Sequence, residues 1–274
     1  GIVKIGVADA FDDPDNVPIL DAQTYTEEYG LPVLHLDNAP ELTNEHYTPA
    51  TITYRGHIYD AESKLRGASS LNYPKNSYTL KFTKEDKFSD PEVLDGFLEK
   101  RKIVTTTTFD DNSYIRQRLA FELWNRLDPG HIQVQAYNAI LFLEGEYWGL
   151  YMIGDHIDGY LMEDHDRYQD CNLFKARTHD ANFRLVDYEG NPKSTLHQGL
   201  TKSEGVPLDG EPGAFDDLEE LVNFVATAPS EQFLAELDGR IDRRDYENWW
   251  IFVTAISASD SAGKNSYHYH DPAG

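Results

Sequence analysis

Cysteine is almost absent from the sequence, since Cys171 is the only one among 274 residues. One thiol excludes an internal disulfide, and it excludes a zinc site that needs two or four cysteines. Long apolar runs are absent as well, because no stretch reaches the roughly 18 residues that a membrane-spanning helix needs. We therefore expect neither a disulfide-bonded fold nor insertion into a membrane.

Positive charge is also scarce. The sequence has 24 Lys and Arg residues against 48 Asp and Glu residues, which gives a net charge of −24. The negative electrostatic field of such a protein repels phosphate. It therefore excludes nucleic acid as a general partner and disfavours anionic membrane surfaces. A solvated acidic surface explains the charge most simply, and binding of cations by part of that surface is the alternative.

Apolar residues, in contrast, are plentiful enough for a core. Hydrophobic residues make up 40% of the sequence and aromatic residues 12%, so wholesale disorder is excluded. We predict an irregular acidic segment over residues 1–30 and one domain over residues 31–274. The acidic segment has a cluster around Pro14 that resembles a calcium loop only loosely, because the EF-hand spacing and its closing Glu are missing.

Strand patterns fill the first half of the chain and helix patterns the last third. Alternating and β-branched segments predict strands at 31–36, 50–54, 58–59, 77–82, 134–142, 147–153 and 172–175. Helical spacing of apolar residues predicts helices at 115–127, 216–227, 230–237 and 245–256, the last with Trp249 and Trp250 in the core. We therefore predict an α+β fold with a strand-rich N-terminal half and a helix-rich C-terminal half, packed as one two-lobed unit.

The most informative chemistry lies near the C-terminus, where Asp260 and Asn265 stand five positions apart in a loop after a helix. Protein kinases use the spacing Asp-x-x-x-x-Asn in their catalytic loop, where the Asp accepts the proton of the substrate hydroxyl and the Asn binds a metal ion. Lys264 lies between them and is suited to neutralise a transferring phosphoryl group. The alternative is a plain loop after a helix, closed by Gly263.

A second pattern is a turn of small residues between strands, followed by two lysines. Arg66, Ser69 and Ser70 lie in the turn, and Lys75 and Lys81 follow it. Backbone N–H groups in such a turn can hold phosphate, and a lysine on the next strand can pair with the same group. A β-turn with exposed lysines is the alternative, because the motif Gly-x-x-x-x-Gly-Lys-Ser/Thr is missing.

Glu122 is the third candidate. It lies on the predicted helix 115–127, where a kinase places the Glu that fixes its phosphate-binding lysine. A surface carboxylate is the alternative. The order of these patterns along the chain (phosphate turn, strand lysine, helix glutamate, hairpin, helices, Asp-x-x-x-x-Asn) is the order that a kinase-like fold requires.

In this order the motifs resemble the spore coat protein H (CotH) kinase family of atypical secreted or surface protein kinases. The matching segments run in family order from about residue 31 to residue 271. They are 65–70 (Leu-Arg-Gly-Ala-Ser-Ser), 74–82 (Pro-Lys-Asn-Ser-Tyr-Thr-Leu-Lys-Phe), 111–116 (Asp-Asn-Ser-Tyr-Ile-Arg), 144–151 (Glu-Gly-Glu-Tyr-Trp-Gly-Leu-Tyr), 172–175 (Asn-Leu-Phe-Lys) and 265–269 (Asn-Ser-Tyr-His-Tyr) with Asp260. Each segment is short, but the combination is specific.

The resemblance implies a protein-kinase-like fold that binds ATP with Mg²⁺, or with Mn²⁺ or Ca²⁺ in its place. It also implies phosphorylation of Ser or Thr on partner proteins, and a secreted or cell-surface location. Carried over by position, Asp260 is the catalytic aspartate, Asn265 is a metal ligand, and Tyr151 begins the connection near the adenine. The candidates for phosphate contact are Lys75, Lys81 and Lys175.

The chain departs from the family pattern at three places. Asn76 replaces the second Lys of a Lys-Lys pair, and Asp155 stands where the family usually has Glu. The family continues with a Trp-Asp-x-Asp segment that supplies a second metal-binding aspartate, whereas this sequence reaches Gly274 first. We therefore expect a CotH-kinase-like domain that is incomplete at its C-terminus, with Asp271 as the stand-in metal ligand.

Two functions follow from this sequence. The first is a CotH-type protein kinase. The second is a catalytically weak, kinase-shaped module that binds at a surface or assembles an extracellular structure, which the acidity and the missing aspartate favour. The sequence does not identify the protein substrate, the flanking modules or the oligomeric state.

Overall fold

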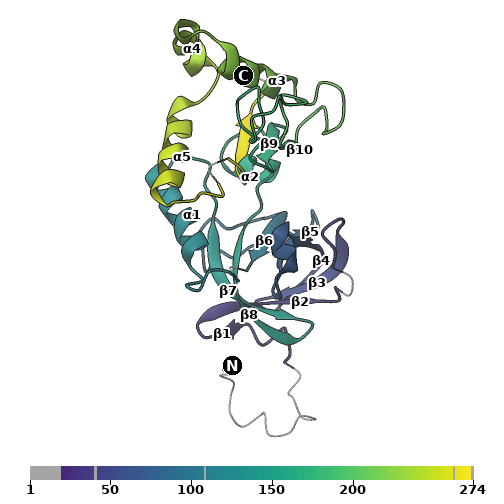
Figure 1. Ribbon diagram of the computed structural model, residues 1–274. Coiled ribbons are helices and arrows are strands. Elements are labelled where there is room, and N and C mark those ends of the chain that lie inside the picture. The colour runs from purple at the N-terminus through teal and green to yellow at the C-terminus, as the bar shows by residue number, and fades with distance from the viewer. Residues whose placement is uncertain (1–19, 40–41, 108, 262, 273–274) are drawn as a thin grey trace. The chain divides into compact units, whose positions relative to one another are not determined.

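The computed structural model describes residues 20–39, 42–107, 109–261 and 263–272 (Figure 1). Most of the predicted acidic segment 1–30, including its cluster around Pro14, lies outside the described residues. The chain divides into two compact units, Gly1–Leu119 with Gln135–His156, and Ala120–Val134 with Ile157–Gly274. The first unit carries a large sheet, and the second carries a small sheet and most of the helices.

Eight strands form the sheet of the first unit, in the spatial order β1-β2-β3-β4-β5-β6-β8-β7. They are β1 (Glu27–Glu28), β2 (Leu31–Asp37), β3 (Thr48–Tyr54), β4 (His57–Arg66), β5 (Ser77–Phe82), β6 (Lys102–Thr106), β7 (Ala136–Leu143) and β8 (Glu146–Asp155). Tight turns with two left-handed residues join β3 to β4 and β7 to β8, as the right-handed twist of paired strands favours. The second of these hairpins joins the strands predicted at 134–142 and 147–153.

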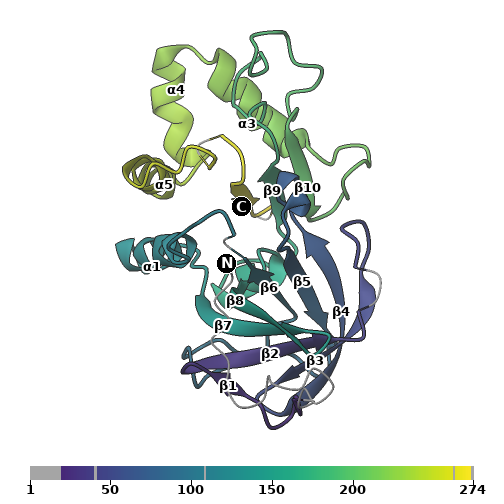
Figure 2. The same ribbon diagram turned by 60° about the horizontal axis from the view of Figure 1, so that its bottom comes forward.

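The large sheet closes on itself through β2. This strand pairs antiparallel with β3 and parallel with β7, where Val33 lies opposite Ile140 and Leu36 opposite Leu143. Seven strands thereby form a closed ring, and β1 pairs with Leu31 and Pro32 at the start of β2 (Figure 2). Because β2 has neighbours on both sides, its residues 32–36 are all buried, as in strands of covered parallel sheets.

The second unit combines three strands with short helices. The strands β9 (Asn172–Ala176), β10 (Leu200–Glu204) and β11 (Tyr267–His270) lie in the order β10-β9-β11. The helices are α2 (Gly159–Asp164), α3 (Asp216–Thr227), α4 (Ser230–Glu236) and α5 (Arg243–Ala255), and α1 (Arg116–Leu127) runs from the first unit into the second. A 3₁₀ turn follows β4 at Ser69–Asn72, and another follows α4 at Leu237–Gly239.

The predicted fold class is wrong. The structure is 23% helical and built on the closed seven-stranded sheet, not on two lobes of the protein-kinase type with a helix-rich C-terminal half. Single elements agree with the prediction, since the helix expected at 216–227 is α3 and the strand expected at 77–82 is β5. The assembly differs because the parallel β2–β7 pair joins segments far apart in the sequence, and because residues 177–199 contain only turns, bends and an isolated bridge.

The helix α1 begins one residue after the predicted start at 115 and exposes its apolar stripe. Asp111 accepts hydrogen bonds from the hydroxyl and backbone N–H of Ser113 and from the backbone N–H of Arg116, and these bonds lower the pKa of Asp111 to about 2. The stripe stays about half exposed, and its residues are Ile115, Leu119, Leu123 and Leu127. The expected burial of Trp250 on α5 is also wrong, because 49% of this residue is exposed. None of the described helices has the length and apolar character that crossing a bilayer requires.

Candidate functional site

The residues predicted to carry phosphoryl transfer lie in both units. The Asp260 loop, which we define as residues 257–261 and 263–266, connects α5 to β11 in the second unit. Lys175 on β9, Glu122 on α1 and Asp271 after β11 belong to the same unit. The remaining predicted residues lie in the first unit: Arg66, Ser69, Ser70, Lys75, Lys81 and Tyr151.

Asp260 and Asn265 are brought together by the fold of the Asp260 loop. One carboxylate oxygen of Asp260 accepts a hydrogen bond of 2.6 Å from the side-chain amide of Asn265. The other oxygen lies 2.8 Å from Nζ of Lys264. The Asp260 side chain is 68% exposed, so an acceptor hydroxyl from solvent can reach it. The loop thus presents a carboxylate, an ammonium and an amide within one short segment.

A β-bulge positions Asn265 for this contact. The backbone N–H of Asn265 donates to the carbonyl of Ala176, and the N–H of Ala176 donates to the carbonyl of Ser266, so two residues of one strand oppose one residue of β9. Asn265 has a φ of 57°, a left-handed conformation that Asn tolerates better than most residues. The bulge directs the Asn265 side chain back to Asp260 instead of along β11, which begins at Tyr267.

Lys175 lies on β9 next to this bulge. It is paired across the sheet with Tyr267, and its Nζ lies 5.3 Å from the centre of the Tyr267 ring. A cation over an aromatic face is attracted to the ring but keeps its N–H donors free for an anion. The structure therefore places Lys175 on the strand that pairs with the segment holding Asn265, and its contact with phosphate stays a prediction.

Lys75 and Tyr151 form a separate cluster in the first unit. Nζ of Lys75 donates a hydrogen bond of 2.8 Å to the carbonyl of Leu150 and lies 4.4 Å from the centre of the Tyr151 ring. The Tyr151 hydroxyl donates to the carbonyl of Asn76 at 2.8 Å. Burial lowers the pKa of the Lys75 ammonium to about 8, because charge is unfavourable away from water. A side chain at Gly149 would come within 3.4 Å of this amine.

Acylation should reveal this property of Lys75. Only the neutral amine attacks an acylating reagent, and a lysine with a pKa of about 8 is half neutral at that pH, whereas an ordinary lysine needs about pH 10.4. We expect limiting acetic anhydride at pH 8 to modify Lys75 before Lys81, whose Nζ is held 2.6 Å from Glu62. Peptide mass spectrometry across pH 6–10 measures both rates. Parallel titration of the two lysines would contradict the assignment.

The turn after β4 is held together by hydrogen bonds among its own residues. Arg66 is the last residue of β4, and Ser69 and Ser70 begin the 3₁₀ turn. The amide of Asn76 donates to the carbonyl of Ser70 at 3.3 Å and thereby braces the turn. Gly67 has a φ of 141°, and any Cβ there would clash with the hydroxyl of Ser70.

Glu122 and Asp271 are the two predicted residues of the second unit that lie outside both the Asp260 loop and β9. The carboxylate of Glu122 pairs with Arg126 one turn along α1, at 2.6 Å, and not with any of the three predicted lysines. Asp271 follows β11 directly and lies near Cys171, whose thiol pKa is raised to about 11, mainly by burial with the charges of Glu204 and Asp271 adding. That thiol stays protonated at neutral pH, so Cys171 is not activated as a nucleophile.

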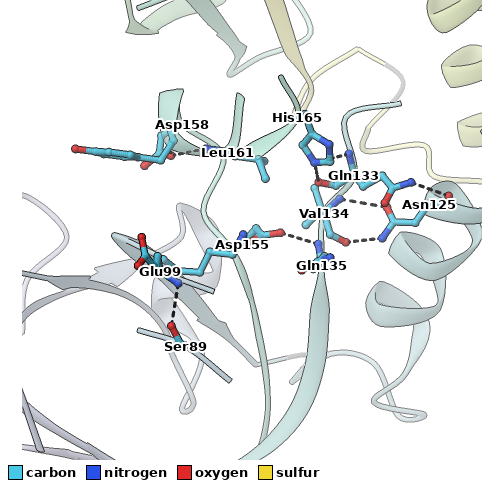
Figure 3. Close-up of polar contacts among 12 residues, drawn as sticks. Ser89, Glu99, Asn125, Gln133, Val134, Gln135, Asp155, Asp158, Leu161 and His165 are labelled. Atoms are coloured by element: carbon cyan, nitrogen blue, oxygen red, sulfur yellow. Dashed lines mark hydrogen bonds and ion pairs between the residues drawn. The ribbon is translucent and has the colours of Figure 1, made fainter. Parts of the chain in front are cut away.

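Asp155, at the end of β8, is part of the sheet's own support. Its carboxylate lies 2.9 Å from Nζ of Lys100 and accepts a hydrogen bond of 2.8 Å from the backbone N–H of Gln135 (Figure 3). The nearby Asp158 caps α2 by accepting from the N–H groups of Tyr160 and Leu161. Within the described ranges, no group of three or more His, Cys, Asp or Glu side chains is arranged to hold a metal ion by itself.

Comparison with known proteins gives two matches. A family model described as CotH kinase protein matches residues 64–274. The inner spore coat protein H of Bacillus subtilis (strain 168) is 25% identical over 213 residues, which make up 77% of this chain and 54% of the relative. The chain thus spans about half the length of this curated relative. The match begins next to the turn at Arg66 and includes the whole Asp260 loop.

Proposed function

Since the chain belongs to the CotH kinase protein family, we propose that it transfers the γ-phosphate of ATP to Ser or Thr hydroxyls of partner proteins. The observation that carries this proposal is the contact of Asp260 with Asn265 and Lys264 in one exposed loop. A carboxylate, a cation and an amide are groups that kinases use at the acceptor side of phosphoryl transfer to a hydroxyl.

Two residues of the Asp260 loop and one residue of the neighbouring strand have tasks in the proposed reaction. Asp260 accepts the proton of the acceptor hydroxyl as the new O–P bond forms and the bond to ADP breaks. Lys264, which lies 2.8 Å from Asp260, balances negative charge on the phosphoryl group. Lys175, on the neighbouring strand, is the candidate that contacts the phosphates from the second unit.

The residues of the loop fit a magnesium ion that arrives with the nucleotide. Mg²⁺ takes oxygen ligands and usually keeps phosphate oxygens and waters alongside only one or two protein groups. The side-chain oxygen of Asn265 is such a ligand, and its amide nitrogen is already engaged with Asp260. When bound, the ion would supply charge neutralisation on the phosphates, and Asp271 is the second candidate ligand.

Calorimetry and phosphotransfer test the proposal directly. ATP is titrated into the 274-residue chain and into the full-length protein, with Mg²⁺, Mn²⁺, Ca²⁺ or EDTA. Transfer from γ-labelled ATP is then followed on the chain itself and on dephosphorylated casein. We expect metal-dependent binding and label on Ser or Thr. Absence of nucleotide binding and of transfer by the full-length protein in every metal would overturn the proposal.

A second function is a catalytically weak module that assembles a surface layer. Two facts favour it: the net charge of −24, and a relative named as an inner spore coat protein. We propose an association with a spore coat or a cell surface in either case. The Asp260→Asn variant separates the two functions. An assembly module would keep its surface location in this variant, and the parent protein would transfer no phosphate.

A further inference from the structure

Arg177 is an exposed cation next to the Asp260 loop. It directly follows β9, and its backbone N–H donates to the carbonyl of Gly199 at 2.8 Å, so the chain is still held as a strand there. Side chains alternate along a strand, which places Arg177 on the same face as Lys175. Among the described residues, no carboxylate lies within ion-pair distance of its guanidinium.

The other exposed arginines of this acidic chain are mostly neutralised. Arg126 pairs with Glu122, Arg243 with Glu247, and Arg244 with Asp128, each at 2.7 Å or less. Acidic residues outnumber basic ones two to one, so an arginine that meets no carboxylate leaves its five N–H donors available. Arg118 is another exposed arginine without an ion pair among the described residues, and Arg177 differs from it in lying next to the Asp260 loop.

Two contacts bring the segment after β9 against the Asp260 loop. Ala176 exchanges backbone hydrogen bonds with Asn265 and Ser266, so Arg177 follows the residue that anchors the bulge. His179 lies two residues after Arg177. If residue 263 carried a Cβ, that atom would lie 3.3 Å from Nδ1 of His179. Gly263 thus lets an exposed imidazole approach the loop closely, and residues 175–179 run alongside it.

Residues 175–179 place basic side chains beside this loop in a protein that is acidic as a whole. A net charge of −24 repels ATP and acidic peptides alike. The basic side chains of the segment are Lys175, Arg177 and His179, and Lys264 in the loop itself is engaged with Asp260. Local cations are what a negatively charged molecule needs to bind an anion beside a catalytic carboxylate.

We propose that Arg177 binds the anionic group that lies next to the acceptor hydroxyl at Asp260, with His179 positioned beside it. This inference rests on the proposed function of the Asp260 loop. Guanidinium matches phosphate and carboxylate through two parallel N–H···O bonds, which a lysine cannot form. The anion has two sources, the phosphates of the nucleotide or an acidic side chain near the acceptor Ser or Thr.

Binding of inorganic tripolyphosphate tests the anion site without any catalysis. The parent chain, Arg177→Gln and Arg177→Lys are compared by calorimetry at low salt. The control is Arg118→Gln, since Arg118 is an exposed arginine of the first unit. We expect Arg177→Gln to weaken tripolyphosphate binding about 10-fold or more, as for loss of a bidentate contact, and Arg177→Lys to restore part of it. Arg118→Gln should bind as the parent does.

Kinetics then identifies the source of the anion. A rise of KM for ATP in Arg177→Gln assigns the contact to the nucleotide. An unchanged KM for ATP with loss of preference for acceptor peptides that carry Asp or Glu beside Ser assigns it to the protein substrate. Arg177→Gln matching the parent in tripolyphosphate binding, KM and peptide preference would overturn the inference. Tripolyphosphate binding through Arg177 without any phosphotransfer by the parent would instead count against the kinase function alone.

Discussion

Replacing Asp260 with Asn should lower the rate of phosphotransfer about 100- to 10,000-fold, the range that a positioned proton acceptor contributes. The substitution keeps the size of the side chain but removes its negative charge. It also replaces the two carboxylate oxygens with one amide N–H₂ and one neutral oxygen. One carboxylate oxygen of Asp260 lies 2.8 Å from Nζ of Lys264, and the other accepts a hydrogen bond of 2.6 Å from the side-chain amide of Asn265. We therefore expect the loss in kcat, with KM for ATP changed only a few-fold. Initial rates with γ-labelled ATP measure both.

Asp238→Asn is the matched control for this variant. Asp238 is another exposed aspartate of the second unit, 3.9 Å from Arg243, and has no place in the proposed reaction. Both variants should unfold within a few tenths of a kcal/mol of the parent, because substitutions at exposed sites of this kind seldom change stability more. An Asp260→Asn protein that retains a tenth or more of the parental rate would refute the role assigned to Asp260.

Local patterns predict most elements of this chain well, even where the apolar stripe stays half exposed, as in α1. The helix α3 covers residues 216–227 as expected, since Leu218 and Val222 occupy its buried stripe. The strand β9 and the hairpin of β7 and β8 also follow from local alternation and turn residues. These features depend on neighbours within a few residues, which the sequence displays directly.

Closure of the sheet depends on distant neighbours, and the sequence carries only a weak sign of it. In β2 five consecutive residues are buried, which indicates a strand covered on both faces and bordered on both edges. The run Pro32 to Leu36 is apolar apart from His35, and that histidine is buried and bonded through its ring to the carbonyl of Tyr25. Such a run does not say which strand lies beside it, so the parallel pairing with β7 could not be derived.

The candidate site also combines contacts that follow from local patterns with contacts between distant segments. The spacing of Asp260 and Asn265 predicts that a single loop brings them together, and the structure has the two side chains in contact. The bulge that orients Asn265 uses Ala176, almost 90 residues earlier, and has no local pattern. Arg177 and its approach to the Asp260 loop follow from that bulge. The roles of the predicted residues stay predictions, and the variants above test them.

The buried ion pair of Lys100 and Asp155 should carry the largest stability effect in the first unit. The two charged atoms lie 2.9 Å apart, with side-chain exposures of 9% and 2%. Lys100→Met should lower the free energy of unfolding of this unit by about 3–5 kcal/mol, because it leaves the Asp155 carboxylate buried without its cation. Asp155 joins β8 to Gln135 and lies opposite Ile103 of β6, so loss of its partner should loosen both strands.

Hydrogen exchange and calorimetry distinguish this effect from a general one. We expect faster amide exchange in Lys102–Thr106 and Glu146–Asp155 of the Lys100→Met variant, with the second unit unchanged. Lys87→Met is the control, since Lys87 pairs at 3.3 Å with a Glu99 side chain that is 80% exposed, and such pairs contribute about 1 kcal/mol or less. The double variant Lys100→Met with Asp155→Leu should recover part of the stability, because removing both charges leaves neither one buried alone. Equal losses of unfolding free energy in Lys100→Met and Lys87→Met would show that burial does not increase the contribution of the Lys100–Asp155 pair to stability.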